Sequence, residues 1–327
     1  MKKTASIILA IALIFTLFSF TGCKDTGGET SGLTIISTIY PQYDFVKEIV
    51  GNKATSKMLI TPGAESHTYE PTPQDIIAIN KADVFIYVGG DSDAWVSDIL
   101  KSIDNKNLKI ITLMDCVDLV PENEDVAGTN ESESESGEEE ETEYDEHVWT
   151  SPKNAIKIVN KITEALKKLD TSNAETFQAN ADAYTAKLNK LDTDIRKVIS
   201  DANGTADLKV ETSKNTIVVA DRFPLRYFVD SFNLNYCAAF PGCSTETEVS
   251  AKVLAALIDK VKQLKIKYVL YIEFSNENIA DTVCESTGAK KKLFYSCHNV
   301  TKTDYEKGVS YLEFQERNLE TLKEILV

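Results

Sequence analysis

Residues 82–88 read ADVFIYV, in which five consecutive apolar residues follow an acidic one. A short apolar run that is rich in β-branched and aromatic residues is typical of a strand. Because no polar residue interrupts the run, we expect the strand to be buried on both faces, as strands of parallel sheets are. The segment therefore predicts an α/β fold.

Strand and helix patterns alternate on either side of this segment. The predicted strands are at 33–37, 57–60 and 109–113, and the predicted helices are at 43–50, 71–80 and 93–101. This alternation indicates a parallel sheet with helices on both of its sides.

The second half of the chain repeats the alternation. The predicted strands are at 216–220, 268–272 and 292–295, and the predicted helices are at 224–232, 249–264, 277–287 and from Tyr311 onward. Between the halves, apolar residues recur at helical spacing over 156–169 and 173–201. A helix of about 30 residues is about 45 Å long, enough to join two domains. We therefore expect an N-terminal domain at 33–151, linking helices at 152–202 and a C-terminal domain at 203–327.

Residues 1–23 have the layout of an export signal peptide. Two lysines precede an apolar run at 7–20, which is shorter than the roughly 20 residues that a membrane-spanning helix needs. The small residues before Cys23 resemble the lipobox of bacterial lipoproteins, which would place a lipid on Cys23. Residues 24–32, rich in Gly, Thr and Ser, are expected to form a flexible tether.

Most of the net charge of −16 lies in one segment, because thirteen Asp or Glu residues and no Lys or Arg occur at 122–146. The centre of this segment has almost no apolar residue, so we expect a disordered acidic loop. It would be either a solvated spacer or a collector of cations. The acidity of the chain also argues against a nucleic acid as partner.

The chain has three histidines, and two lie in predicted loops of the N-terminal half. His67 follows a predicted strand, and His147 lies where the acidic segment rejoins the fold. Ligand sites of open α/β sheets lie at the carboxyl ends of strands, and neutral imidazole binds zinc, manganese and iron. A single histidine is more often a surface or core residue, but this pair favours a metal site. His298 also follows a predicted strand and is either a further ligand or a structural residue.

Several motifs together resemble the zinc and manganese solute-binding proteins of ABC importers. They are His67 with the sequence YEPTP at 69–73, Ala82-Asp83 before the apolar strand, His147 with Trp149 and Pro152, and the stretch 311–322. The resemblance covers residues 37–326. It implies two (β/α) sandwich domains joined by a long rigid helix, with the metal in the cleft between the domains. It also implies that His67 and His147 are metal ligands.

The C-terminal half departs from the pattern of this family. Zinc-type members carry a third His, and manganese-type members a Glu, where this chain has Arg222, and a cation does not coordinate a cation. We therefore expect Asp221 to be the third ligand, with a helix N-cap or a partner of Arg222 as its alternative role. Glu273, at the end of a predicted strand, is the expected fourth ligand, and Glu277 is the alternative.

Five cysteines remain apart from Cys23. No Cys-x-x-Cys motif is present, so neither a thiolate zinc knuckle nor a thioredoxin-like redox site is expected. An odd number leaves at least one cysteine free. Some zinc-type relatives have a disulfide in the C-terminal domain, so the resemblance favours a pair between Cys243 and Cys297.

The resemblance implies capture of a divalent transition-metal ion outside the cytoplasm and its delivery to the permease and ATPase of an ABC importer. Two histidines and two carboxylates do not decide between metals. The acidic loop takes the place of the His-rich loop of zinc-type members, which favours Zn²⁺, with Mn²⁺ as the alternative. The chain lacks H-E-x-x-H, G-x-S-x-G and P-loop motifs, so we expect no enzyme. A surface adhesin is the alternative of another class. We expect a lipid-anchored, extracytoplasmic monomer.

Overall fold

The apolar segment at 84–88 lies inside a four-stranded parallel sheet. In this computed structural model, β3 (Val84–Tyr87) pairs with β1 (Thr34–Ser37) on one side and with β4 (Lys109–Thr112) on the other. β2 (Thr55–Met58) completes the order β2-β1-β3-β4. The first three residues of β3 are fully buried and point alternately into two different cores. The prediction of a strand covered on both faces is confirmed.

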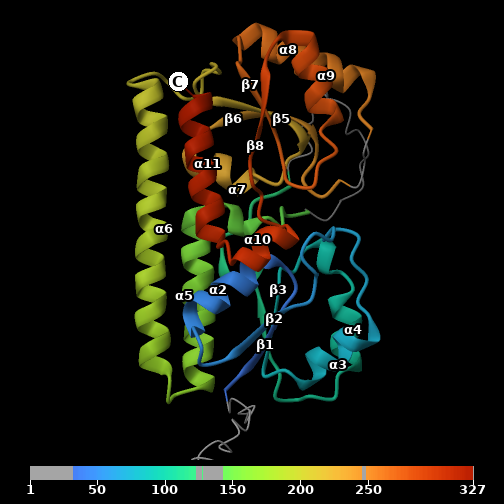
Figure 1. Cartoon of the computed structure of the whole chain (residues 1–327), viewed down its shortest axis with the longest axis vertical. Helices are drawn as coiled ribbons and strands as arrows, with labels where there is room; N and C mark the ends of the chain where they lie inside the picture. Colours follow the sequence, from blue (N-terminus) through green and yellow to red (C-terminus); the bar gives the residue numbers. More distant parts are fainter. Residues whose placement is uncertain (1–31, 123–126, 128–142, 245–247, 327) are drawn as a thin grey trace, which may run out of the picture. The chain divides into compact units, whose positions relative to one another are not determined.

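A second four-stranded parallel sheet lies in the C-terminal half (Figure 1). Its order is β6-β5-β7-β8. The strands are β5 (Thr216–Arg222), β6 (Asn235–Phe240), β7 (Tyr268–Tyr271) and β8 (Lys290–Leu293). Two parallel sheets with helices between their strands confirm the predicted α/β class.

Most helices connect successive strands. The α-helices of this kind are α2 (Tyr40–Val50), α3 (Pro73–Lys81), α4 (Val96–Ser102), α7 (Arg226–Phe232), α8 (Ala251–Leu264) and α9 (Asn278–Thr287). Short 3-10 turns form η1 (Asp91–Asp93), η2 (Met114–Cys116) and η3 (Val148–Thr150), and α10 (Lys302–Lys307) follows the last strand.

Three longer helices link the halves: α5 (Pro152–Leu169), α6 (Ala174–Asn203) and α11 (Tyr311–Ile325). α6 runs alongside both sheets and contacts α5, α2 and α11 (Figure 1). Leu188 of α6 belongs to the core under the first sheet, whereas Ile195 belongs to the core of the second sheet. One continuous helix therefore takes part in both cores. The sequence predicts a helix at 173–201 that is long enough to do so.

The structure describes residues 32–122, 127, 143–244 and 248–326. The predicted signal peptide, the lipidation site Cys23 and nearly all of the tether lie outside these residues, as does most of the predicted acidic loop. Residues 32–327 form one compact unit. Within the described part of the chain, no helix is both long and apolar enough to cross a membrane.

The two ends of the acidic segment are held together. Pro121 and Tyr144 form an antiparallel bridge, and the amide of Asp145 donates a hydrogen bond to the carbonyl of Val120 at 3.0 Å. Asp145 and Glu146 are buried. The predicted disordered loop at 122–146 therefore extends too far toward the C-terminus, because Asp145 and Glu146 belong to the fold beside His147.

Candidate metal centre

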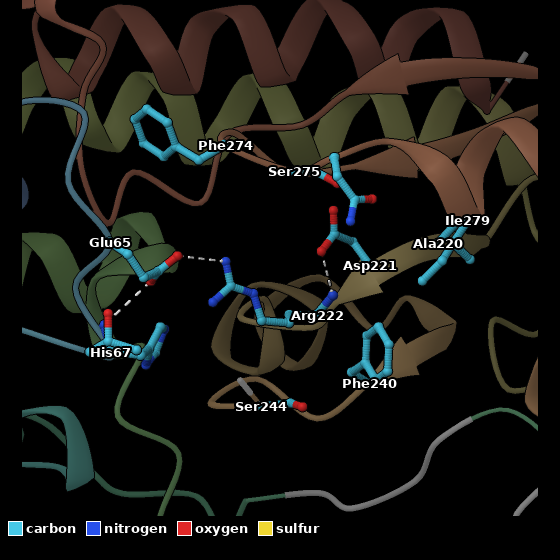
Figure 2. Close-up of a pocket in the computed structure, with 12 residues that line it drawn as sticks. Glu65, His67, Ala220, Asp221, Arg222, Phe240, Ser244, Phe274, Ser275 and Ile279 are labelled. Carbon is cyan, nitrogen blue, oxygen red and sulfur yellow. Dashed lines mark hydrogen bonds and ion pairs between the residues drawn. The ribbon is translucent and has the colours of Figure 1, made fainter. Parts of the chain in front are cut away.

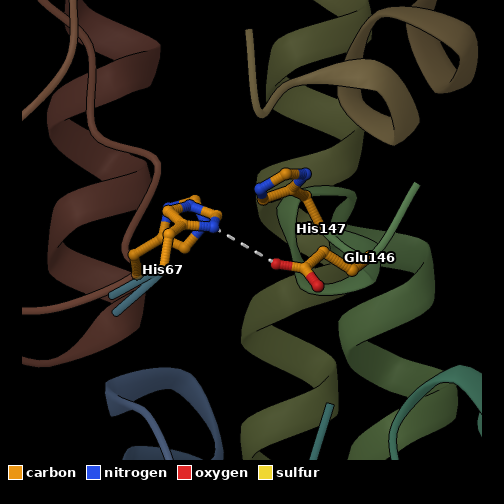
Figure 3. A group of neighbouring side chains, drawn as sticks. His67, Glu146 and His147 are labelled. Atoms are coloured by element: carbon orange, nitrogen blue, oxygen red, sulfur yellow. Dashed lines mark ion pairs between the residues drawn. The ribbon is translucent and has the colours of Figure 1, made fainter. Parts of the chain in front are cut away.

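The three histidines of the chain meet in space, together with Glu146. His67 comes from the loop between β2 and α3, Glu146 and His147 directly precede η3, and His298 follows β8. Each of the four side chains offers one ligand atom, and these atoms all lie within 4.8 Å of one another. The ring centroids are 4.6–5.8 Å apart. Figure 3 shows Glu146 and His147 on one side of this group and His67 on the other.

His147 is completely buried and is held by its neighbour in sequence. Its Nδ1 lies 3.0 Å from Asp145 Oδ1, which also accepts a hydrogen bond from the His147 amide at 2.8 Å. Gly242 lies against the ring, because a Cβ atom at this position would be 2.8 Å from His147 Cε1. The His147 Nε2 atom is buried and has no hydrogen-bond partner in the described structure.

His298 is held by a serine two residues before it. Its Nδ1 lies 2.8 Å from Ser296 Oγ, and this hydroxyl donates to Glu273 Oε1 at 2.7 Å. The Ser296 amide donates to the other carboxylate oxygen at 2.8 Å. Like that of His147, the Nε2 atom of His298 is buried and has no hydrogen-bond partner among the described residues.

His67 is held in the same manner from the N-terminal half. Its Nδ1 lies 2.7 Å from Ser92 Oγ, and this hydroxyl donates a short hydrogen bond to Glu146 Oε1. The Ser92 amide donates to Glu146 Oε2 at 3.0 Å. Glu146 Oε1 is itself 3.6 Å from His67 Nδ1. Glu146 therefore lies within reach of the histidine group while it is bound to Ser92.

The surroundings keep two of the rings neutral. Burial, followed by the neighbouring His147, lowers the pKa of His67 to about 4. Burial and the same neighbour hold the pKa of His298 well below its ordinary value. Burial also disfavours the charged form of His147, but the attraction of Asp145 outweighs this effect and raises its pKa. Neutral rings have the free nitrogen lone pair that a metal ligand requires.

This group fits a divalent transition-metal ion. A buried nitrogen without a hydrogen-bond partner costs about 1–3 kcal/mol, and His147 and His298 each contribute one such atom to a group whose ligand atoms lie within 4.8 Å of one another. Imidazole nitrogens, with or without a carboxylate, form zinc sites of four ligands or of three ligands and an open position. The donor set is therefore suited to a metal rather than to an organic ligand.

The structure places the two predicted carboxylate ligands outside this group. The Oδ1 atom of Asp221 accepts a hydrogen bond from the Arg222 amide at 2.8 Å, and its Oδ2 lies 3.4 Å from the Ile272 amide. Glu273 is buried behind His298, where both of its oxygens are bound to Ser296. The alternative ligand Glu277 pairs with Lys291 at 2.7 Å.

A small cavity lies beside His67 (Figure 2). Its volume is about 270 Å³, and its walls include Glu65, Asp221 and Arg222. The Arg222 guanidinium crosses from the end of β5 to pair with Glu65, with 3.1 Å between Nη2 and Oε2. Arg222, which the resemblance places at a ligand position of the family, is therefore one half of an ion pair in this chain.

The predicted disulfide is not formed. The structure contains Cys243 and Cys297 as free cysteines. Cys297 belongs to the hydrophobic core and accepts a hydrogen bond from Gln315, whereas Cys243 lies in the loop near Glu122 and Glu146. The two thiols thus have different surroundings.

The turn that carries His298 has a strained backbone. Cys297 has a φ of 65°, which is the left-handed region that non-glycine residues rarely adopt. Such a conformation costs on the order of 1 kcal/mol and occurs mostly at functional sites. Here it lies between Ser296 and His298, whose side chains contact each other.

Sequence reasoning missed Glu146, Ser92 and the bracing role of Asp145. The sequence predicts Glu146 to be part of the acidic loop, because acidic residues continue up to it and no Lys or Arg intervenes. Its position next to His147 is the available signal, since a residue adjacent to a predicted ligand lies near the predicted metal site. No sequence signal distinguishes Ser92 from the other serines of the chain.

Comparison with known proteins identifies the family of this chain. Residues 35–325 match the family model "ZnuA: Zinc-uptake complex component A periplasmic". The zinc-binding protein AdcA of Streptococcus pyogenes is 31% identical over 99% of this chain, and the chain spans 61% of its length. The high-affinity zinc uptake system protein ZnuA of Bacillus subtilis is 30% identical, and the alignment covers 100% of this chain and 99% of that protein.

Solved structures show the same architecture. The Zn(II)-bound ZnuA-like domain of Streptococcus pneumoniae AdcA has a TM-score of 0.70 and 30% identity, covering 90% of this chain and 99% of the domain. The metal-dependent lipoprotein YcdH of Bacillus subtilis has a TM-score of 0.72 and 29% identity, covering 90% of this chain and 100% of its own. With a family model that matches nearly its whole described length, the chain belongs to the ZnuA family of zinc-uptake components.

Proposed function

We propose that this chain captures one zinc ion outside the cytoplasm, at His67, His147 and His298, and delivers it to an ABC importer. The observation that carries the proposal is the pair of buried Nε2 atoms on His147 and His298, which have no hydrogen-bond partner in the described structure. A bound ion would compensate the cost of leaving both atoms without a partner.

The donor set supports zinc over manganese. Manganese prefers oxygen-rich sites of higher coordination number, whereas imidazole nitrogens are ordinary zinc ligands. The group contains three imidazoles and at most one carboxylate. The relatives described above are named as zinc-binding or zinc-uptake proteins.

Release of the ion to the importer would be possible because both halves of the chain contribute ligands. His67 and His147 come from the N-terminal half, and His298 comes from the C-terminal half. A displacement of one half by the permease and ATPase of an importer would remove a ligand and release the ion. Lipidation of Cys23, a residue outside the described structure, would hold the protein at the membrane. This role is transport, and no enzymatic activity is proposed.

Metal content tests the binding part of the proposal. The full chain is stripped with a chelator, reloaded with zinc or manganese, and analysed for bound metal by mass spectrometry. We expect one equivalent of zinc in the parent and its loss in His67→Ala, His147→Ala and His298→Ala. Glu277→Ala is the control and should retain zinc, because Glu277 pairs with Lys291 outside the group. A parent that binds no zinc would refute the proposal.

Growth under zinc limitation tests delivery. Cells that lack this chain should grow poorly in chelated medium, and the parent chain should restore growth. A His147→Ala, His298→Ala double variant should not restore it. If the double variant restored growth as well as the parent, zinc delivery would not depend on these histidines, which would contradict the proposed role.

A further inference from the structure

Two of the histidines are held by the same three-residue arrangement, built separately in each half of the chain. In the N-terminal half, His67 Nδ1 contacts Ser92 Oγ at 2.7 Å, and Ser92 donates to Glu146. In the C-terminal half, His298 Nδ1 contacts Ser296 Oγ at 2.8 Å, and Ser296 donates to Glu273. In both arrangements the serine amide also binds the same carboxylate.

The direction of these hydrogen bonds determines which ring nitrogen is free. A serine hydroxyl has one hydrogen, and an ionised carboxylate can only accept. Because the hydroxyl hydrogen goes to the glutamate, the serine oxygen must accept from the Nδ1–H group of the histidine. A neutral ring that is protonated on Nδ1 has its lone pair on Nε2. Asp145, which also only accepts, imposes the same tautomer on His147 directly.

The position of the Glu146 side chain is restricted by its neighbours. Glu146 is buried, and its carboxylate lies directly against the backbone of Gly90, where a Cβ atom would be 2.2 Å from Glu146 Oε2. Both of its oxygens are already bound by Ser92. The hydroxyl that binds Glu146 Oε1 is the same one that contacts His67 Nδ1, so that the position of this carboxylate is linked to the orientation of the ring.

We propose that Glu146 and Glu273 are positioning residues of the zinc site, which act through Ser92 and Ser296 and are not ligands. The ion is then held by the Nε2 atoms of the three histidines, with a fourth coordination position open. This inference rests on the proposed function. It assigns one role to two glutamates, of which one lies in the acidic segment and the other follows β7.

Double-mutant cycles test the inference, with zinc dissociation constants measured by competition with a chelating dye. Outer partners of a metal-bound histidine typically contribute 10- to 100-fold in affinity. We therefore expect Ser92→Ala and Glu146→Gln each to weaken zinc binding about 10- to 100-fold, and the double variant to be no weaker than the weaker single variant. The pair Ser296→Ala and Glu273→Gln should behave in the same way. Glu146→Gln combined with Glu273→Gln should multiply the two losses, because the residues act on different histidines.

Matched variants separate positioning from a general loss of structure. Ser92→Thr keeps the hydroxyl and should restore affinity. Ser97→Ala removes a serine hydroxyl that is bound only to the Ala94 carbonyl, and it should have no effect. The visible spectrum of the Co²⁺-loaded protein should keep the same band pattern in Glu146→Gln and in Ser92→Ala.

Two results would overturn the inference. One is independent, multiplying losses for Ser92→Ala and Glu146→Gln. The other is a Co²⁺ spectrum that changes in Glu146→Gln but not in Ser92→Ala, which would make Glu146 a ligand. A parent chain that binds no zinc would instead refute the proposed function, so the two failures are distinguishable.

Discussion

The guanidinium of Arg222 lies 3.1 Å from the carboxylate of Glu65, so that the end of β5 is joined to the loop that carries His67. The pair borders the cavity beside His67. Arg222 also lies close enough to lower the pKa of both His67 and His298, after the larger effects of burial and of the neighbouring rings. The positive charge of Arg222 thus lies beside the candidate zinc site, and the negative charge of Glu65 balances it.

The two members of this pair should have opposite effects on zinc affinity. Glu65→Gln leaves Arg222 unbalanced and should weaken zinc binding about 3- to 10-fold, whereas Arg222→Gln should strengthen it by a similar factor. Both effects should shrink as salt is added. Isothermal titration at two ionic strengths measures them, and Arg226→Gln, from the Arg226–Asp230 pair on α7, is the control. Weaker binding in both variants would show instead that the ion pair acts by holding the His67 loop against the end of β5.

Asp44 should make stability depend on pH. Burial raises its pKa to about 7, although the Tyr311 amide donates a hydrogen bond to its Oδ2 at 2.8 Å. Because the folded pKa lies above the unfolded value of about 4, the ionised form destabilises the fold, and stability falls as pH rises from about 4 to about 7. Asp44→Asn should therefore increase the free energy of unfolding by roughly 1–3 kcal/mol at pH 8, with little gain at pH 4.

Denaturant unfolding of the metal-free protein at several pH values measures this difference. The exposed substitution Asp182→Asn serves as control and should change stability by less than about 0.5 kcal/mol. A gain from Asp44→Asn that is the same at pH 4 and pH 8 would contradict the assignment.

Gly242 should be required for the position of His147. A methyl group at this residue would lie 2.8 Å from His147 Cε1 and 3.1 Å from the Phe223 carbonyl, so Gly242→Ala must displace the ring. We expect about a tenfold loss of zinc affinity in a dye competition assay. Gly204→Ala is the matched control, because nothing lies within 4 Å of its added carbon. Its positive φ would lower stability but leave zinc affinity unchanged. Equal zinc affinity in parent and Gly242→Ala would contradict the packing argument.

The shared helix α6 should make unfolding a single event. Leu188 and Ile195 are fully buried in different cores, and shortening either side chain should cost about 2–5 kcal/mol. Because residues 32–327 form one compact unit, Leu188→Ala and Ile195→Ala should each lower the midpoint of one common transition in calorimetry. Two separated transitions in either variant would show that the halves unfold independently.

The elements with strong periodicity could be predicted from the sequence. The long helix was expected over 173–201 and is observed as Ala174–Asn203, and the apolar segment at 84–88 forms β3. β6 (Asn235–Phe240) was missed, because its sequence NYCAAF contains small and polar residues and no β-branched one. Its place beside β5 comes from pairing with that strand, which is a tertiary effect.

The candidate site was predictable only in part. The loops of His67, His147 and His298 could be placed at the ends of strands, because parallel strands put their carboxyl ends on one edge. The role of Glu273 could not be read in the same way, since its side chain turns toward Ser296 rather than toward the histidine group. The neighbouring residues Phe274 and Cys297 have left-handed backbones, which no residue preference predicts.

The bridge between Pro121 and Tyr144 has a consequence for how this site can evolve. It closes the acidic segment at its base, and the residues that follow, Asp145, Glu146 and His147, each contact a different part of the histidine group. Insertions on the far side of the bridge leave the spacing of these three residues intact, whereas one extra residue after Tyr144 would shift all three at once. We therefore expect that exchanging the acidic stretch for one of another length, between Pro121 and Tyr144, leaves the metal centre intact.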